Sequence, residues 1–170
     1  MGAIQTSAAI ALTTNQETGW GQQARQSLAQ SNVCALLANG ADEAEVAAAI
    51  QPHVDELRTA IAGYQAEVLP LRDLADSVLE QVVAEEIGGF VRLTGGGWMP
   101  EHRQEFIDQC CVEFGLIPAS VIIPAIRLAR RKVFDPKRFV SWVFEFVDKD
   151  IVRLENEGKQ LGELARIAGI

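Results

Sequence analysis

The chain has 170 residues, of which 48% are hydrophobic and 22% are charged. These values are typical of a single globular domain, and they exclude a disordered chain, a collagen, a disulfide scaffold and a polytopic membrane protein. The net charge of −8 also excludes a generally basic nucleic-acid-binding protein. Aromatic residues make up only 6% of the chain while aliphatic residues are plentiful, so we expect an all-α helical bundle.

The negative charge is concentrated in the first part of the chain. Residues 1–97 contain four arginines and twelve acidic residues, a net charge of −8, whereas residues 98–170 contain eleven basic and eleven acidic residues. An acidic half beside a neutral half indicates two surfaces with different partners. A requirement for solubility alone accounts for the same distribution.

Helical periodicity divides the acidic half into an arm and a series of helices. The arm is rich in Thr, Ser and Gln and lacks periodicity. Asn39 and Gly40 are expected to end the first helix, and Asp42 with Glu45 resembles a capping box at the start of the second. We predict an N-terminal arm over residues 1–18 and an acidic subregion over residues 19–87, with helices at 20–38, 42–50, 54–68 and 71–87.

A glycine-rich stretch interrupts the helical pattern at residues 88–99. Gly88 and Gly89 are expected to end the preceding helix, and Gly95–Gly97 follow shortly after. The stretch lacks the lysine and hydroxyl of a GxxxxGK[ST] phosphate loop and the GxGxxG pattern of a dinucleotide site. We therefore predict a flexible linker loop between two helical subregions.

The second subregion, residues 100–170, is also predicted to be helical. Pro100 suits the first position of a helix, which Gly115 is expected to end. Pro118 and Pro124 predict an irregular entry into the helix that follows, because proline lacks a backbone N–H.

A long helix is predicted after Asp135 and Pro136, which suit its N-cap and its first position. Gly158 is expected to end it, and residues 160–168 form a short tail helix. The apolar residues of Phe139–Leu154 cover about 200° of the circumference, whereas a surface helix usually shows a narrower stripe. This helix either lies at the centre of the bundle or exposes part of this face to a partner or to a second copy of the chain.

Positive charge is concentrated between residues 127 and 138, where six basic residues and the single acid Asp135 give a local charge of +5. On a helical wheel, the arginines of the first helix here lie opposite an apolar stripe of Ile122, Ile126, Ala129 and Val133. We call the basic residues the basic ridge: Arg127, Arg130, Arg131, Lys132, Lys137 and Arg138.

The next helix extends the basic ridge with Trp142, Lys149 and Arg153, which lie within about 60° of Arg138 on its wheel. Arg138 and Trp142 are four residues apart, a spacing suited to a cation–π contact. A basic surface beside an aromatic side chain fits the phosphates and bases of a nucleic acid, and it fits an acidic protein surface equally well. The third explanation is that the basic ridge pairs with the acidic half of this protein or is simply solvated.

The cysteines Cys34, Cys110 and Cys111 follow no pattern of a disulfide framework or a zinc site. We expect reduced thiols in a cytoplasmic protein that binds no metal and no cofactor. No apolar run is long enough to span a membrane, so no membrane partner is expected. The GxSxG motif of serine hydrolases is absent, and an enzyme would have to use Cys110 or His102. We therefore expect a protein that is not an enzyme.

The second half of the chain resembles a family of phage proteins. The resemblance rests on the stretches Pro100–Ile107, Leu116–Pro118, Leu128–Arg131 and Phe139–Val143. Over residues 100–155 the chain is similar to small helical replication accessory proteins of phages and prophages, of the helicase-loader type. This resemblance implies a non-enzymatic adaptor that meets a replication protein and DNA.

The expected function is that of a non-catalytic phage or bacterial adaptor or regulator. It would bind a protein partner, or nucleic acid, through the basic ridge with Trp142 as an anchor. The alternative is an acidic inhibitor that covers a nucleic-acid-binding surface of a host or defence protein. Its contact residues would be Asp42, Glu43, Glu45, Asp73, Asp76, Glu80, Glu85 and Glu86.

Overall fold

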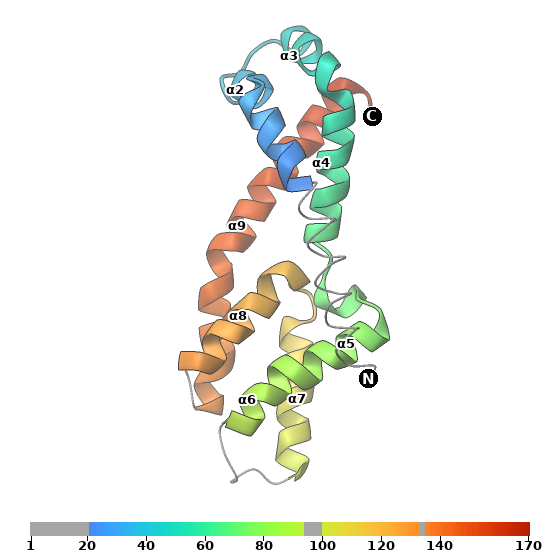
Figure 1. Ribbon diagram of the computed structural model, residues 1–170. Coiled ribbons are helices and arrows are strands. Elements are labelled where there is room, and N and C mark those ends of the chain that lie inside the picture. The colour runs from blue at the N-terminus through green and yellow to red at the C-terminus, as the bar shows by residue number, and fades with distance from the viewer. Residues whose placement is uncertain (1–20, 94–99, 133–134) are drawn as a thin grey trace. The chain divides into compact units, whose positions relative to one another are not determined.

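The computed structural model describes residues 21–93, 100–132 and 135–170 (Figure 1). Almost all of these residues are helical and none lies in a strand, which confirms the all-α prediction. No helix in this part of the chain combines the length and the apolar character that a membrane span requires. The α-helices are a first helix over residues 21–30, α2 (Val33–Ala38), α3 (Glu43–Ile50), α4 (Val54–Glu67), α5 (Asp76–Val82), α6 (Gly88–Leu93), α7 (Pro100–Phe114), α8 (Ala119–Lys132) and α9 (Pro136–Ala168).

The chain divides into two compact units. The first unit contains Met1–Glu67 and Leu154–Ile170, and the second unit contains Val68–Arg153. Helix α9 therefore contributes its beginning to the second unit and its end to the first. This division follows the packing of helices and differs from the predicted division of the chain at residues 88–99. The predicted arm and the second half of the predicted linker lie outside the described residues.

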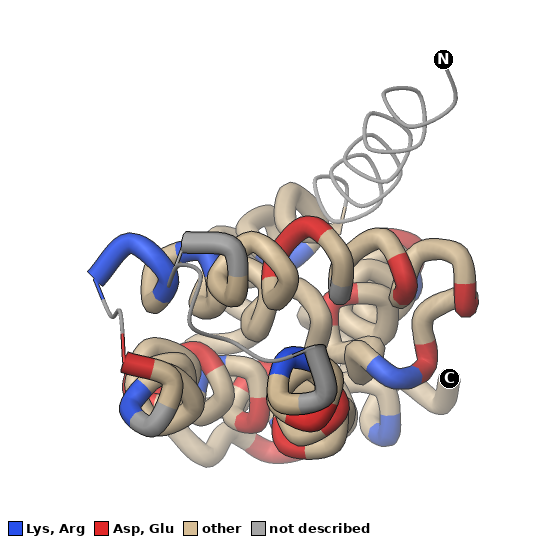
Figure 2. Tube along the Cα trace, turned by 90° about the horizontal axis from the view of Figure 1, so that it is seen from below, with Lys and Arg blue, Asp and Glu red and all other residues tan. Residues whose placement is uncertain are grey.

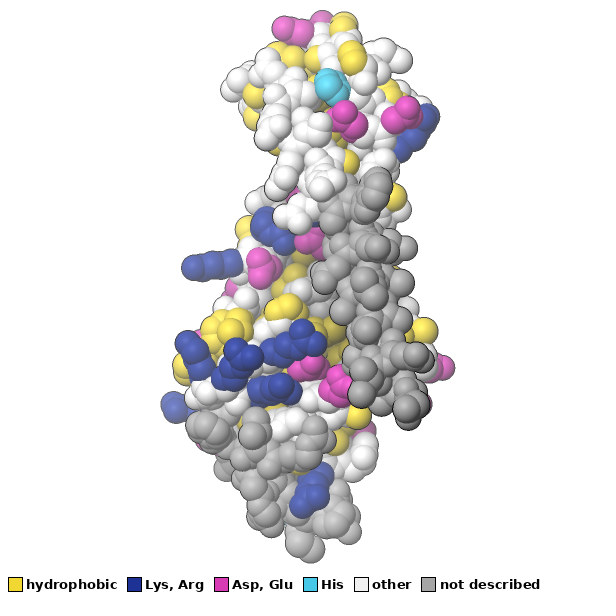
Figure 3. Space-filling view, viewed as in Figure 1, with side chains coloured by type: hydrophobic (Ala, Val, Ile, Leu, Met, Phe, Trp, Pro, Cys, Tyr) yellow, Lys and Arg dark blue, Asp and Glu magenta, His cyan; other side chains and the backbone are white. Residues whose placement is uncertain are grey.

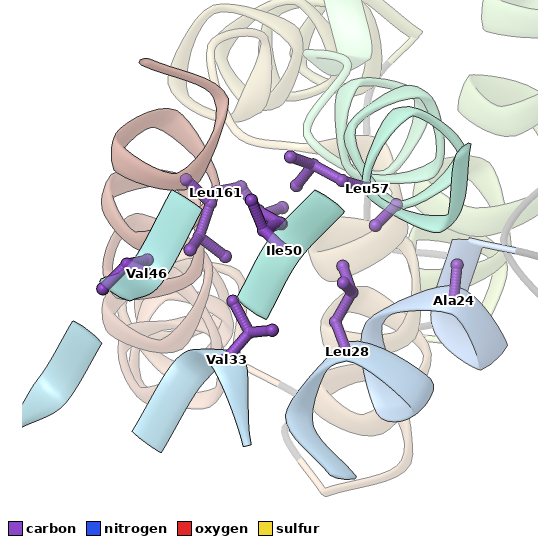
Figure 4. Close-up of a cluster of buried hydrophobic side chains, with 9 residues drawn as sticks. Ala24, Leu28, Val33, Val46, Ile50, Leu57 and Leu161 are labelled. Atoms are coloured by element: carbon purple, nitrogen blue, oxygen red, sulfur yellow. The ribbon is translucent and has the colours of Figure 1, made fainter. Parts of the chain in front are cut away.

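Aliphatic side chains form the core of the first unit, and they come from the helix over residues 21–30, from α2, α3 and α4, and from the end of α9 (Figure 4). Burial of each larger side chain contributes about 1.5–3 kcal/mol. The first helix also meets α4 at Gly21 and Gly63, where a Cβ on either residue would lie closer than 3.0 Å to the backbone of the other. The buried cluster consists of Ala24, Leu28, Val33, Val46, Ile50, Leu57, Ala60, Leu161 and Leu164.

Local sequence signals set most helix ends of the first unit. Gly40 has a φ of 69°, which confirms the predicted stop after α2. Asp42 is the N-cap of α3 as predicted, but its side chain makes no capping hydrogen bond, so the predicted capping box is wrong. The predicted first helix is also interrupted, because Asn32 adopts a left-handed φ of 68° that asparagine tolerates. The Ser31 hydroxyl donates to the carbonyl of Leu28 at this break, at 2.6 Å.

Helix α9 is continuous over 33 residues, so the prediction that Gly158 ends it is wrong. The physical reason is a tertiary contact, because the side chain of Tyr64 occupies the space that a Cβ at Gly158 would need. The Tyr64 hydroxyl donates to the carbonyl oxygen of Leu154 at 2.7 Å. Helix α9 instead ends before Gly169, whose φ of 72° is the left-handed conformation of a helix stop.

Phenylalanine side chains form the core of the second unit. The ring centroids of Phe90 and Phe139 are 3.9 Å apart, and those of Phe106 and Phe114 lie 5.9 and 6.5 Å from that of Phe139. Phe90 belongs to α6, so the loop predicted from residue 88 is wrong for the helical residues of Gly88–Leu93. Burial of the Phe90 ring offsets the low helix propensity of the two glycines, about 1 kcal/mol each.

The irregular entry predicted before Pro124 is helical in the structure, and Pro124 lies inside α8. Val121 and Ile122 are buried before it, and Ala125 and Ile126 are buried after it. This packing compensates for the hydrogen bond that the proline cannot donate.

A π-helical turn, Val83–Ile87, connects α5 to α6. The helix that was expected from residue 71 starts at Asp76 instead, after a short 3-10 turn at Leu71–Asp73. The π-helical turn contacts both α7 and α8. It carries the acidic residues Glu85 and Glu86, which belong to the site described below.

Candidate partner-binding site

Helix α8 has one buried face and a basic C-terminal end. Ile122, Ile126 and Ala129 are fully buried, which confirms the predicted stripe, while Val133 lies outside the described residues. Lys and Arg side chains gather on the face of the second unit that contains α8 (Figure 3). The negative end of the helix dipole stabilises positive charge at this position. The basic residues of the last turn are Arg130, Arg131 and Lys132.

A buried glutamate, Glu86, pairs with two arginines of the basic ridge. Its side chain is only 6% exposed and comes from the π-helical turn. Arg127 approaches Glu86 Oε1 with both Nε and Nη2, at 2.8 Å each. Arg130 Nη1 lies 3.4 Å from Glu86 Oε2 and donates to the backbone carbonyl of Glu85 at 3.0 Å. The π-helical turn thus binds Arg130 through both a side chain and the backbone.

The pairing explains how the Glu86 carboxylate is buried. Transfer of an unpaired carboxylate out of water costs several kcal/mol, so its burial requires positive charge close by. Arg127 and Arg130 supply two positive charges for one negative charge, and the three side chains keep a net charge of +1. Arg127 remains 55% exposed and Arg130 remains 29% exposed, so this excess charge lies at the surface.

The basic ridge is therefore not a uniform set of outward-pointing cations. For Arg127 and Arg130 the third explanation holds, pairing with the acidic half of this protein, because Glu86 and the Glu85 carbonyl bind them. Arg131, Lys132 and Arg138 are exposed, and the side chain of Lys137 lies outside the described part. Figure 2 shows the basic positions that end α8 and begin α9 on either side of the short undescribed link.

The aromatic anchor predicted beside the basic ridge is half-buried. The ring of Trp142 contacts the ring of Phe146, with centroids 6.0 Å apart and an interplanar angle of 54°. The predicted contact between Trp142 and Arg138 stays a prediction. Lys149 is exposed, and Arg153 forms an ion pair with Asp150 at 3.8 Å.

The wide apolar face of α9 lies largely inside the protein. Phe139, Val143, Val147 and Leu154 are buried, which favours the central-helix explanation. Val152 is 55% exposed. Self-association through this helix stays a prediction.

The acidic residues of the alternative hypothesis are distributed over both units. Asp42, Glu43 and Glu45 belong to the first unit, whereas Asp73, Asp76, Glu80, Glu85 and Glu86 belong to the second. All of them are exposed except Glu86. The prediction that Glu86 belongs to an acidic surface is wrong, because it is buried against the arginines of α8. Glu43 forms an ion pair with Arg166 of the same unit.

The two residues considered for an enzymatic function, Cys110 and His102, both lie on α7 and differ in exposure. Cys110 is fully buried, and burial raises the pKa of its thiol to about 12, so it holds little of the thiolate that acts as a nucleophile. Burial also raises the pKa of Cys111. His102 is exposed near the start of α7. The described residues contain no group of three potential metal ligands.

The role of Glu86 was missed in the sequence, although one signal for it exists. Glu86 continues the i, i+4 series of Val78 and Val82 along the helix predicted over residues 71–87, where a charged residue is unexpected. A charged residue on such a stripe requires a partner. The partner Arg127 is 41 residues away in the chain, so the sequence does not identify it.

Comparisons of the chain with protein-family models, with curated proteins and with solved structures find no significant match.

Proposed function

We propose that this protein is a non-catalytic binding protein that docks onto an acidic surface of another protein through the basic ridge. The observation that carries the proposal is the anchoring of Arg127 and Arg130 at the surface by Glu86, next to the exposed Arg131 and Lys132. These residues give a local excess of positive charge on a chain whose net charge is −8. Such a patch complements carboxylates on a partner.

The charge of the second unit favours a protein partner over a nucleic acid. The unit contains eleven basic and thirteen acidic residues, a net charge of −2. Duplex DNA carries one negative charge about every 1.7 Å along its axis, so its phosphates beyond the basic ridge would meet acidic side chains. The negative charge of an acidic patch or a short acidic segment of a protein covers a small area. Such a partner can contact the basic ridge alone.

The resemblance of residues 100–155 to helicase-loader-type phage proteins suggests the kind of partner. On this basis the partner is a replication protein of a phage or of its bacterial host. Acidic side chains on its surface would form ion pairs with the basic ridge.

A binding measurement with matched charge reversals tests the proposal. The probe is a fluorescent peptide of about twelve residues in which Glu alternates with Gly. Arg131→Glu should weaken binding about tenfold, because it reverses a charge inside the basic ridge. Arg58→Glu is the control, since it makes the same change at an exposed arginine of the first unit and should leave binding nearly unchanged.

Two results would overturn the proposal. One is the absence of peptide binding at about 20 mM salt, where screening is weak. The other is an equal loss of affinity for Arg131→Glu and Arg58→Glu. Tighter binding of a DNA duplex of about 20 base pairs than of the peptide, with a steep salt dependence, would assign a nucleic acid instead.

A further inference from the structure

We infer that Arg127 and Arg130 are the carboxylate-binding anchors of the basic ridge and that Glu86 is the residue that positions them. This inference rests on the proposed function and assigns different roles to cations within one surface. Arg127 and Arg130 recognise individual carboxylates of the acidic partner. The exposed Arg131 and Lys132 supply long-range attraction, which acts mainly on the rate of association.

The geometry of Arg127 leaves part of its guanidinium available. Its Nε and Nη2 both point to one oxygen of Glu86, while its Nη1 takes no part in this pair. A guanidinium carries five N–H donors in one plane, so it can hold Glu86 and still donate to a ligand. The side chain is 55% exposed, so a partner can approach it from the solvent.

Arg130 is held next to Arg127 by one hydrogen bond and one ion pair, both through Nη1. Its Nη1 contacts Glu86 Oε2 and the Glu85 carbonyl oxygen, and 29% of the side chain remains exposed. The two arginines are three residues apart on α8, so their side chains lie next to each other on the helix surface. Because both contact the same buried carboxylate, their guanidinium groups are close together, an arrangement that fits the oxygens of a carboxylate.

The anchoring arginines differ from the other cations of the basic ridge because Glu86 orders their side chains before a partner binds. A long flexible side chain loses conformational entropy when it is fixed in a complex, and this loss weakens binding. Arg127 and Arg130 are held by Glu86 before a partner arrives, so less entropy is lost on binding. Arginine is also one of the residue types that are enriched among the residues that dominate interface energetics.

Neutralising substitutions at two neighbouring glutamates separate this inference from simple electrostatics. Glu86→Gln and Glu85→Gln each remove one negative charge beside the basic ridge, so long-range electrostatics predicts tighter binding of the acidic peptide for both. The inference predicts that Glu86→Gln weakens binding about threefold or more, because the arginines lose their anchor. Glu85→Gln leaves the Glu85 carbonyl in place and should bind the peptide as tightly as the wild type or more tightly.

Lysine substitutions provide a second test that does not remove the buried carboxylate. Arg127→Lys keeps the charge but loses the planar group that bridges Glu86 and a ligand, so peptide binding should weaken about fivefold. Arg58→Lys is the control at an exposed arginine outside the basic ridge and should change the affinity less than twofold.

The outcomes distinguish the inference from the proposed function. Tighter binding by Glu86→Gln, or equal effects of Arg127→Lys and Arg58→Lys, would overturn the inference while the wild type still binds the peptide. A wild-type protein that does not bind the peptide at all would reject the proposed function itself.

Discussion

Tyr64 lies directly against Gly158, and its hydroxyl donates to the Leu154 carbonyl oxygen at 2.7 Å. The contact joins α4 to α9 within the first unit. Burial and the nearby carboxylate of Glu157 raise the pKa of Tyr64, so its hydroxyl stays protonated and remains a donor at neutral pH. Glycine at residue 158 is therefore a packing requirement rather than a helix stop.

Gly158→Ala should lower the free energy of unfolding by about 1–3 kcal/mol, because the new methyl group overlaps the Tyr64 side chain. Gly162→Ala is the matched control on the same helix, since no heavy atom lies within 4 Å of a Cβ there. Alanine favours a helix over glycine, so this control should raise stability by up to about 1 kcal/mol. Chemical denaturation measures both, and equal changes would contradict the packing role of Gly158.

Tyr64→Phe should lower the free energy of unfolding by about 1 kcal/mol, the usual contribution of one hydrogen bond. In the Gly158→Ala background the same substitution should cost less, because the displaced hydroxyl no longer reaches Leu154. A double-mutant cycle by urea unfolding measures this coupling. Additive effects of the two substitutions would show that the hydroxyl and Gly158 act independently.

The contrast between Gly40 and Gly158 shows how much of the fold the sequence predicts. Gly40 ends a helix through its own backbone conformation, a local signal that sequence patterns capture. Pro100 begins α7 for a similarly local reason. Gly158 and Gly89 lie inside helices because of packing between segments far apart in the chain, which overrides local propensity.

The candidate site was predictable only in part for the same reason. The charge pattern of α8 is local, so the basic ridge and its buried stripe follow from the sequence. The ion pairs between Glu86 and the arginines join residues 41 or more positions apart, and no spacing rule connects them. The sequence therefore indicates where positive charge lies but not which cations are fixed.

Glu86→Gln should also lower the free energy of unfolding by about 1–3 kcal/mol, since it removes a buried charged partner of two arginines. Glu85→Gln, at an exposed neighbour, should change it by no more than about 0.5 kcal/mol. Thermal and urea unfolding of the two variants provide the comparison. A Glu86→Gln variant as stable as the wild type would show that the ion pairs contribute little to folding.

Cys110 should resist thiol-specific reagents in the native protein. Its pKa of about 12 leaves roughly one thiol in ten thousand as thiolate at pH 8. Cys34 and Cys111 are half-buried and should react sooner, and all three cysteines should react at once in urea. Rapid modification of all three in the native state would contradict the burial of Cys110.

The raised pKa of Cys110 also predicts a direction for stability at alkaline pH. The folded protein keeps this thiol protonated, whereas the unfolded chain releases its proton near the ordinary thiol pKa of about 8.5. The protonated thiol therefore contributes fully to the free energy of unfolding below that pH. It is lost as the pH rises toward 12. Urea unfolding at pH 8 and pH 10.5 should show a smaller loss of stability for Cys110→Ala than for the wild type, and equal losses would refute this assignment.

A titration of the wild-type protein with the acidic peptide, followed by the NMR resonances of the arginine Nε–H groups, tests the central claim most directly. The account predicts that the resonances of Arg127 and Arg130 shift with the peptide in a saturable manner, whereas that of Arg58 stays in place. Saturable shifts confined to Arg58 or to other arginines outside the basic ridge would contradict the account, and so would a complete absence of shifts.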